Sequence, residues 1–310
     1  MRENIKLISL FSGCGGTDLG FEGGFTFNSK KYEKLPYDLV WANEINSKAC
    51  ITFKENLKKD IVCDDIWNVD LDTLPDADIV TGGFPCQDFS VAGLRKGFNS
   101  KRGLLYLAML NVVNKVKPRV FVAENVKGLL SMDKGCAIQK IVSDFSQAGS
   151  GYKVTTHLLK APDYGISQTR ERVLIVGVRS DINMNFEPPV PTTLDTPVPV
   201  SDILRDLEDL AEGDIPNHYW SKAKLYPGRQ GNITIDPSKP GPTMRAEHHG
   251  NIEFHYNKGR RLSAREAARI QSFPDEFIFY NSTSDAYRQI GNAVPPVLAW
   301  HIAKTLLPFF

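Results

Sequence analysis

Short apolar segments rich in β-branched residues alternate with longer helix-like stretches between residues 5 and 178, and this pattern constrains the fold more than any other feature. Such alternation is typical of βαβ units, in which successive strands lie parallel in one sheet between helices. The candidate strands are residues 6–11, 38–43, 78–81, 119–123, 155–159 and 173–178, and the clearest helical patterns are 103–116 and 136–148. We therefore expect a doubly wound, mostly parallel α/β sheet that binds ligands at the carboxyl ends of its strands.

A proline-rich segment at residues 187–200 interrupts this pattern. Its prolines, Pro188, Pro189, Pro191, Pro197 and Pro199, are too dense for a helix or a central strand. A chain of 310 residues is long enough for about two domains. We therefore assign residues 1–180, completed by 258–310, to one domain, and residues 181–257 to a linker and a second, smaller domain.

The charge of the chain is balanced overall but uneven along its length. Lys and Arg number 37 and Asp and Glu 36, so a nucleic-acid partner would have to be met by a local patch. Residues 181–218 hold nine acidic side chains and one basic, whereas residues 219–261 hold eight Lys or Arg, three acidic side chains and three histidines. The second segment could follow phosphates and bases, or it could be a loop-rich surface with a chance bias; composition favours neither.

Two helices are expected near the C-terminus. Ser263 with Glu266 three residues later is a capping box, and it predicts a helix from Ser263 that Pro274 ends. A last helix follows Pro295 and Pro296 and runs through Leu307, with an apolar face that would pack on the first domain.

The cysteines and the hydropathy indicate the compartment. Cys14, Cys50, Cys63, Cys86 and Cys136 are odd in number and form no Cys-x-x-Cys pair, which argues against a disulfide framework and a zinc site. No apolar run approaches the ~20 residues that a membrane span needs, and the first residues are charged. We expect a soluble cytoplasmic protein with reduced thiols and no metal.

Three segments at predicted strand ends indicate a nucleotide-like ligand. Gly13, Gly15 and Gly16 follow the first strand, where glycines let a ligand approach the backbone and the helix amides. Their spacing is not the dinucleotide fingerprint. Glu44 follows the second strand, where a carboxylate can accept hydrogen bonds from a ribose diol, and Asp65 with Ile66 could meet an adenine amino group. Together they predict a nucleoside-type cofactor.

Cys86 lies in a different kind of setting from the other cysteines. It follows Pro85 in the loop GGFPCQDFS, directly after a predicted strand, where a thiol can be exposed and reactive. The neighbouring strand ends in Glu124 and Asn125, so a carboxyl group could stand over the same pocket. The pairing favours a catalytic role for both side chains.

These motifs resemble, in order, those of DNA (cytosine-5) methyltransferases of the bacterial restriction-modification type. The matching segments are Phe11-Ser-Gly-Cys-Gly-Gly16, Pro85-Cys86-Gln87, Glu124-Asn125-Val126, Gln168-x-Arg170-x-Arg172, 261–274 and Gln289-x-Gly291-Asn292-x-Val294. The resemblance covers the chain apart from roughly 181–245. It implies the Rossmann-like fold of class I S-adenosylmethionine-dependent methyltransferases, with residues 181–257 as a small target-recognition domain.

The resemblance also implies site residues. For S-adenosylmethionine, which leaves as S-adenosylhomocysteine, they are Phe11, Gly13, Cys14, Gly15, Gly16, Glu44, Asp65, Ile66, Pro85, Leu105, Asn292 and Ala293. For double-stranded DNA they are Gln87, Ser90 and Gln168, with groove contacts from some of Arg229, Gln230, Arg245, His248 and His249. Two departures from the family pattern are Ile45, where many relatives have an adenine-stacking aromatic residue, and a longer connection between residues 21 and 39.

The residue types suit methylation of cytosine at carbon 5. The Cys86 thiolate would add to carbon 6, while Glu124 stabilises the ring at nitrogen 3 and the exocyclic amine. The resemblance implies that Arg172 binds the pyrimidine carbonyl and orients Glu124, and it places Arg170 and Gln168 near backbone phosphates. It counts Arg170 among the catalytic residues with Cys86, Glu124 and Arg172. Because a stacked base admits neither thiol nor methyl donor, the target cytosine would be flipped out of the duplex.

Other functions fit parts of the sequence. An RNA cytosine-5 methyltransferase of the same family shares these motifs, although Phe84 and the size of the recognition segment favour DNA. A cysteine hydrolase would use Cys86 with His157 as base, which leaves Glu124 and the glycines unexplained. A non-catalytic DNA-binding module would not need Cys86, Glu124 and Arg172 together.

We expect a monomer that protects host DNA from a cognate restriction endonuclease.

Overall fold

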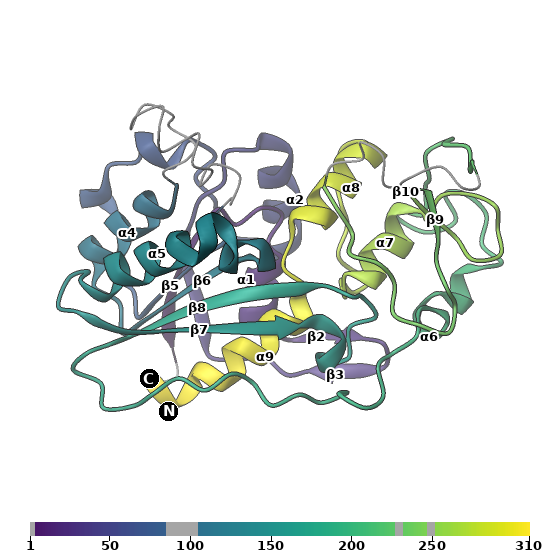
Figure 1. Cartoon of the computed structure of the whole chain (residues 1–310). Helices are drawn as coiled ribbons and strands as arrows, with labels where there is room; N and C mark the ends of the chain where they lie inside the picture. Colours follow the sequence, from purple (N-terminus) through teal and green to yellow (C-terminus); the bar gives the residue numbers. More distant parts are fainter. Residues whose placement is uncertain (1–3, 85–104, 227–231, 247–251) are drawn as a thin grey trace.

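The computed structural model describes residues 4–84, 105–226, 232–246 and 252–310, which form an α/β structure around a six-stranded sheet (Figure 1). The strands are β1 (Ile5–Leu10), β4 (Tyr37–Ala42), β5 (Ile79–Gly82), β6 (Val120–Val126), β7 (Tyr152–Lys160) and β8 (Glu171–Arg179), in the order β4-β1-β5-β6-β8-β7. β4, β1, β5 and β6 are parallel, whereas β8 is antiparallel to β6 and to β7. The mostly parallel sheet is confirmed.

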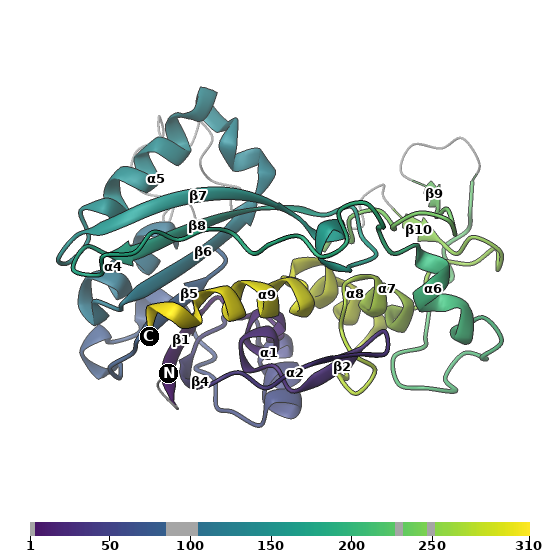
Figure 2. The same ribbon diagram turned by 90° about the horizontal axis from the view of Figure 1, so that it is seen from below.

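Helices cover both faces of this sheet. α1 (Gly16–Glu22) and α9 (Pro296–Leu306) pack together on one face, and α4 (Leu105–Val116) and α5 (Cys136–Ser146) lie on the other (Figure 2). Leu7 of β1 belongs to the first of the two large apolar clusters and Ile8 to the second. Because successive strand residues point to opposite faces, a strand buried on both sides is apolar nearly throughout. This is why β1 could be recognised from its sequence.

α2 (Ser47–Leu57) packs with Leu19 of α1 and Leu39 of β4. On one side of the sheet lie α6 (Val200–Leu204), α7 (Ala264–Ile270), α8 (Thr283–Asn292), β9 (Asn232–Thr234) and β10 (Ile252–Phe254) (Figure 1). Short 3-10 turns are η1 (Ile66–Asn68), η2 (Leu71–Thr73), η3 (Lys127–Leu130), η4 (Met132–Gly135), η5 (Ala161–Tyr164), η6 (Arg205–Leu207) and η7 (Leu307–Phe309). In the described parts of the chain, no helix is long and apolar enough to cross a membrane.

Both helices expected near the C-terminus are present. The Ser263 side chain accepts from the backbone N–H of Glu266 while the Glu266 carboxylate accepts from that of Ser263, so the capping box is confirmed. α9 begins at Pro296 and packs on α1. Between residues 187 and 199 there is no helix or strand, and α6 begins at Val200.

The long connection between α1 and β4 contains a hairpin that we did not predict. β2 (Phe25–Phe27) and β3 (Lys30–Tyr32) pair antiparallel, and the turn residues Asn28 (φ 45°) and Ser29 (φ 59°) both have positive φ. A two-residue turn of this kind matches the twist of the paired strands. The ring of Tyr32 packs edge-on against Trp300, so the hairpin is held by α9.

Candidate active site

The loop between β1 and α1 needs glycine for two reasons. Gly13 (φ 57°) and Gly15 (φ 96°) have a left-handed backbone, which side chains rarely adopt. At Gly16 the reason is space, because a Cβ would lie 2.5 Å from the carbonyl oxygen of Val294 and 3.2 Å from the Cβ of Ala293. The loop therefore packs directly against the segment between α8 and α9, and Ala293 lies beside the predicted glycine loop.

The Glu44 carboxylate fixes the other side of this loop. Its Oε2 accepts a hydrogen bond from the backbone N–H of Gly13 (2.9 Å) and its Oε1 from that of Asn46 (2.8 Å). Burial raises the pKa of Glu44, and these hydrogen bonds oppose the rise. Since an ionised carboxylate has about four acceptor sites, both oxygens keep capacity for the hydroxyl groups of a ribose.

The third predicted segment lies next to Glu44. The backbone N–H of Glu44 donates to the carbonyl of Val62 (3.1 Å), so the chain after Val62 runs along the end of β4. Asp65 then caps η1, in which Ile66 is buried. Because β4 neighbours β1, the glycine loop, Glu44 and the Asp65–Ile66 pair meet at one edge of the sheet.

The other predicted cofactor residues lie around this edge or outside the described residues. Cys14 is buried with Sγ 3.9 Å from the carbonyl of Gln289, and burial raises the pKa of its thiol to about 12. Phe11 is half-buried and has a positive φ of 53°. Leu105 is the first residue of α4, and Asn292 is the exposed last residue of α8. Pro85 lies outside the described residues.

Glu124 and Arg172 form an ion pair at the end of β6. Both strand residues point to the same face, because Glu124 pairs with Leu174 and Val126 with Arg172 in the antiparallel register of β6 and β8. The Nε of Arg172 lies 2.5 Å from Oε1 of Glu124, as an ion pair rather than an aligned hydrogen bond. The side chain of Glu124 is 20% exposed and that of Arg172 is 11% exposed, so the carboxylate is partly shielded but still open to a ligand.

The segment that leads to Cys86 is attached to this ion pair. A Cβ on Gly83 would lie 3.2 Å from Oε2 of Glu124, and Asn125 Nδ2 donates to the Phe84 carbonyl (2.9 Å). β6 runs through Val126, so Glu124 and Asn125 lie within the strand. We had expected the strand to end at residue 123, with both residues directly after it. Cys86, Gln87 and Ser90 lie outside the described residues.

Arg170 and Gln168 are not where we expected them. Both side chains are buried, and the guanidinium of Arg170 donates to the carbonyls of Met244 (3.1 Å), Gly291 (3.1 Å) and Ala293 (2.9 Å). Gln168 Nε2 donates to Oε1 of Gln271, and Gln168 Oε1 accepts from the backbone N–H of Met244. Most of their polar groups are therefore bound to protein groups, and both side chains connect segments that are far apart in the sequence. In this structure both side chains are buried and bind protein groups, which does not fit the predicted phosphate contacts.

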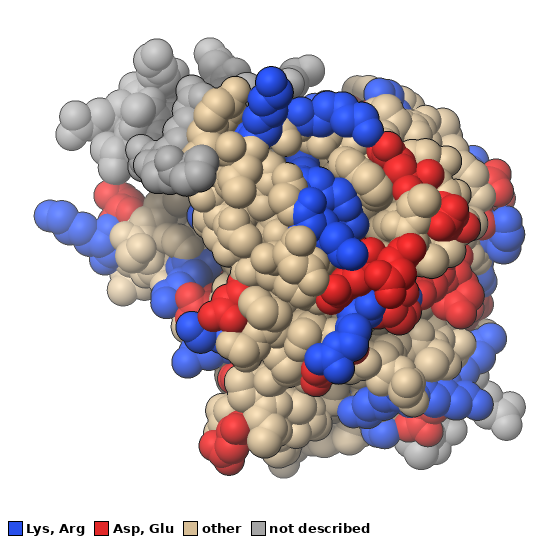
Figure 3. Space-filling model, turned by 90° about the vertical axis from the view of Figure 1, so that its right-hand side faces the viewer, with Lys and Arg blue, Asp and Glu red and all other residues tan. Residues whose placement is uncertain are grey.

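Only part of the basic segment, residues 219–261, is exposed on the protein surface. Arg260 forms two hydrogen bonds of 2.8 Å with the buried Glu266 and lies 4.1 Å from the Trp220 ring, and His255 is buried. Arg245 is exposed. Figure 3 shows Lys and Arg interspersed with Asp and Glu on this side of the molecule. The predicted DNA contacts Arg229, Gln230, His248 and His249 lie outside the described residues.

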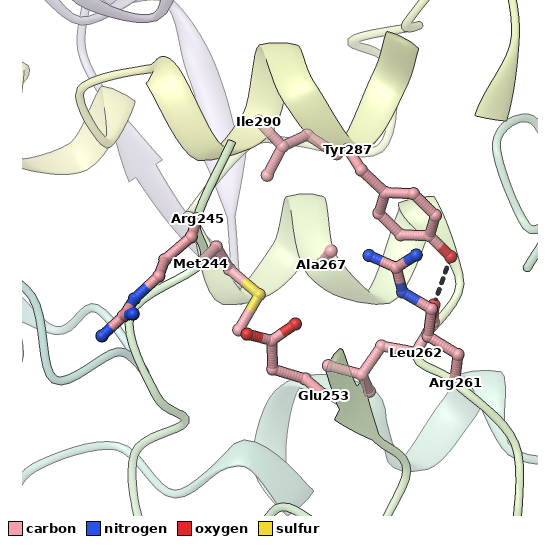
Figure 4. A pocket seen from close by; sticks show the side chains of 8 residues that line it. All are labelled: Met244, Arg245, Glu253, Arg261, Leu262, Ala267, Tyr287 and Ile290. Carbon is pink, nitrogen blue, oxygen red and sulfur yellow. Dashed lines mark hydrogen bonds between the residues drawn. The ribbon is translucent and has the colours of Figure 1, made fainter. Parts of the chain in front are cut away.

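A small cavity of about 10 Å³ separates this segment from α8, enough for about one water molecule (Figure 4). Met244 and Glu253 point toward it, while Arg245 turns away (Figure 4). The guanidinium of Arg261 stacks on the ring of Tyr287 at 3.7 Å. Sequence reasoning found no signal for this packing. Among the described residues, no group of three or more His, Cys, Asp or Glu could hold a metal ion.

Comparison with known proteins places this geometry in a family. Residues 5–234 and 229–307 match the sequence model of C-5 cytosine-specific DNA methylase. The chain is similar to the type II methyltransferases M.NgoFVII of Neisseria gonorrhoeae (39% identity, covering 98% of this chain and 87% of the relative) and M.FnuDI of Fusobacterium nucleatum (36%, covering 97% and 94%). Its fold is similar to that of the S. pombe Dnmt2 methyltransferase, with a TM-score of 0.69 and 19% identity over 98% of this chain and 99% of that one.

Proposed function

We propose that this chain, which belongs to the C-5 cytosine-specific DNA methylase family, methylates carbon 5 of a cytosine flipped out of duplex DNA, through a covalent bond to Cys86. Membership of the family makes the chain a DNA methyltransferase. The covalent step and the roles of single residues are the proposal.

One observation carries it: the partly shielded Glu124–Arg172 ion pair adjoins Gly83 at the start of the Cys86 loop. A carboxyl group beside a loop-borne cysteine is what nucleophilic addition to a pyrimidine requires, because one group attacks while the other holds the ring nitrogen. Gly83 supports this arrangement, since a side chain there would press on the carboxylate.

The steps assigned to the chain are few. The Cys86 thiolate bonds to carbon 6 of the flipped cytosine, which makes carbon 5 nucleophilic. Glu124 holds a proton at ring nitrogen 3, and Arg172 fixes the direction of the Glu124 carboxylate and binds the pyrimidine carbonyl. After carbon 5 is methylated, a base removes its remaining proton and the Cys86 sulfur leaves.

We propose S-adenosylmethionine as the cofactor, which supplies the electrophilic methyl group when bound. The residues at the sheet edge fit it. A Cβ on Gly13 would meet nothing within 4 Å, so the loop is open there, and Glu44 keeps acceptor capacity for a ribose diol. Asp65 caps the turn η1 at the same edge. Ala293, which follows Asn292 at the end of α8, lies against the same loop.

Substrate recognition is proposed for residues 181–257, with Arg245 among the groove contacts. M.NgoFVII and M.FnuDI carry the name type II methyltransferase. By analogy we propose that this chain modifies a short specific sequence, as a cytoplasmic monomer, alongside a restriction endonuclease. An RNA substrate is the alternative that the test below must exclude.

The test is a trapping experiment. Wild-type protein, S-adenosylmethionine and random-sequence duplex DNA containing 5-fluorocytosine should give an adduct that survives denaturant, because fluorine at carbon 5 cannot leave as a proton. Cys86→Ala should give none, whereas Cys136→Ala, which removes an exposed cysteine outside the site, should behave as wild type. Sequencing the trapped DNA identifies the site. An adduct with 5-fluorocytosine RNA and none with DNA would overturn the DNA assignment.

A further inference from the structure

Arg170 joins two segments that have different proposed tasks. One arm of its guanidinium donates to the Met244 carbonyl, next to Arg245 on the recognition side, and the other to the carbonyls of Gly291 and Ala293 on the cofactor side. The side chain is 1% exposed, so these bonds do not compete with water.

The two segments also touch directly. A Cβ on Gly291 would lie 2.2 Å from the backbone nitrogen of Ala246 and 2.3 Å from the carbonyl carbon of Arg245. Gln271 Nε2 donates to the Ala293 carbonyl (2.5 Å), and its Oε1 accepts from Gln168. A displacement of residues 291–293 is therefore passed to residues 244–246 through packed backbone as well as through Arg170.

We propose that Arg170 is a positioning residue that couples cofactor binding to DNA binding. The inference rests on the proposed function, because it takes Asn292 and Ala293 as cofactor contacts and Arg245 as a DNA contact. A cofactor that fixes residues 291–293 fixes the acceptors of one arm of the guanidinium. The planar guanidinium then holds the Met244 carbonyl, and with it the backbone of Arg245, in the position that meets DNA.

Lysine at position 170 keeps the positive charge but lacks the two terminal nitrogens with which the guanidinium binds both segments. An ammonium group is a single point with no second arm, so it cannot hold acceptors on two segments in a fixed relation. By linkage, if the cofactor strengthens DNA binding by some factor, DNA strengthens cofactor binding by the same factor. The coupling can therefore be measured as the effect of DNA on the affinity for the cofactor.

The chain supplies a matched control in Arg265. This side chain is also fully buried, and its guanidinium also donates to backbone carbonyls, those of Pro216, Pro274 and Phe277. These partners all lie outside residues 241–246 and 291–293. Arg265→Lys thus imposes a similar burial cost without touching the proposed connection.

The experiment measures S-adenosylhomocysteine binding by calorimetry, with and without saturating sheared DNA that lacks cytosine methylation. DNA should tighten binding to wild type and to Arg265→Lys about fivefold or more, the lower end of usual coupling factors. In Arg170→Lys the ratio should fall to near one while binding without DNA is retained. An unchanged ratio in Arg170→Lys, or an equal loss in both variants, would overturn the inference.

A measurement on the wild type keeps the inference testable if Arg170→Lys does not fold. S-adenosylhomocysteine alone should slow amide hydrogen exchange in residues 241–246, where the Met244 N–H is bound by Gln168. Binding without any change there would overturn the coupling and leave the proposed function standing. Failure of wild type to bind S-adenosylhomocysteine at all would overturn the proposed function, and the coupling with it.

Discussion

At the scale of single residues, the direction in which a charged side chain points decides its role. Glu124 and Arg172 were predicted as a catalytic pair, and the β6–β8 register brings them together. Arg170 is two positions from Arg172 and carries the same charge, yet it is buried and binds carbonyls. The spacing of the motif does not distinguish these two arginines, since the difference depends on residues more than 70 positions away.

Replacing Glu124 by Gln should lower methyl transfer by about 10²–10⁴-fold, because an amide cannot hold and release the proton at the ring nitrogen. S-adenosylhomocysteine affinity should not change, because the cofactor residues lie elsewhere. Initial rates with tritiated cofactor measure the first effect and calorimetry the second. Glu171→Gln, which removes only a surface ion pair with Lys127, is the control. A variant that keeps wild-type turnover would remove Glu124 from the mechanism.

Gly16→Ala should weaken S-adenosylhomocysteine binding about tenfold or more, a loss of about 1.4 kcal/mol. The added Cβ would meet the Val294 carbonyl at 2.5 Å and push the glycine loop away from residues 293–294. Gly128→Ala is the control, since its Cβ would meet nothing closer than 4.0 Å. Equal affinities of the two variants in calorimetry would contradict the close packing described for Gly16.

At the scale of elements, the sequence predicted the strands and helix ends that local interactions form. The strands of the sheet follow from apolar periodicity, and the capping box of α7 follows from two residues three positions apart; both were predicted. The β2–β3 hairpin was not, because its strands are three residues long and the turn Asn28-Ser29 lacks the usual glycine. Its stability comes from contacts such as Tyr32 with Trp300.

Ser263→Ala should lower the free energy of unfolding by about 2 kcal/mol, near the top of the range for a lost N-cap. The Ser263 hydroxyl is buried and bonds both the Glu266 N–H and His218 Nδ1 (3.0 Å). Ser282→Ala removes the cap of α8, which is less buried, and should cost about 1 kcal/mol. Urea unfolding of both variants compares them; a larger loss for Ser282→Ala would show that burial does not set the cost.

At the scale of the whole molecule, buried histidines make stability depend on pH. Burial lowers the pKa of His301 to about 4, and the nearby Lys30 and Lys304 act in the same direction. The unfolded chain therefore binds a proton that the folded chain does not, below a pH of about 6.5. The stability contributed by neutral His301 is present above that pH and is lost as the pH falls toward 4.

His301→Phe should therefore become more stable relative to wild type as the pH falls from 7 to 4. The ring lies among Tyr32, Tyr164 and Trp300, which a phenyl group can also contact. The change in the difference should be on the order of 3 kcal/mol at pH 4. Urea titrations at several pH values measure it, and a difference that does not vary with pH would show that the pKa of His301 is not lowered in the folded protein.

The sequence by itself determined the sheet, because alternating apolar strands and amphipathic helices have few compact arrangements. It also predicted the chemistry, since Cys86, Glu124 and the glycine loop are recognisable from residue type and position after a strand. Only the tertiary structure decided which polar side chains stay partly exposed and which are buried and hold the protein together. Arg170 and Gln168 are charged or polar in any sequence reading, and their burial follows from partners far along the chain.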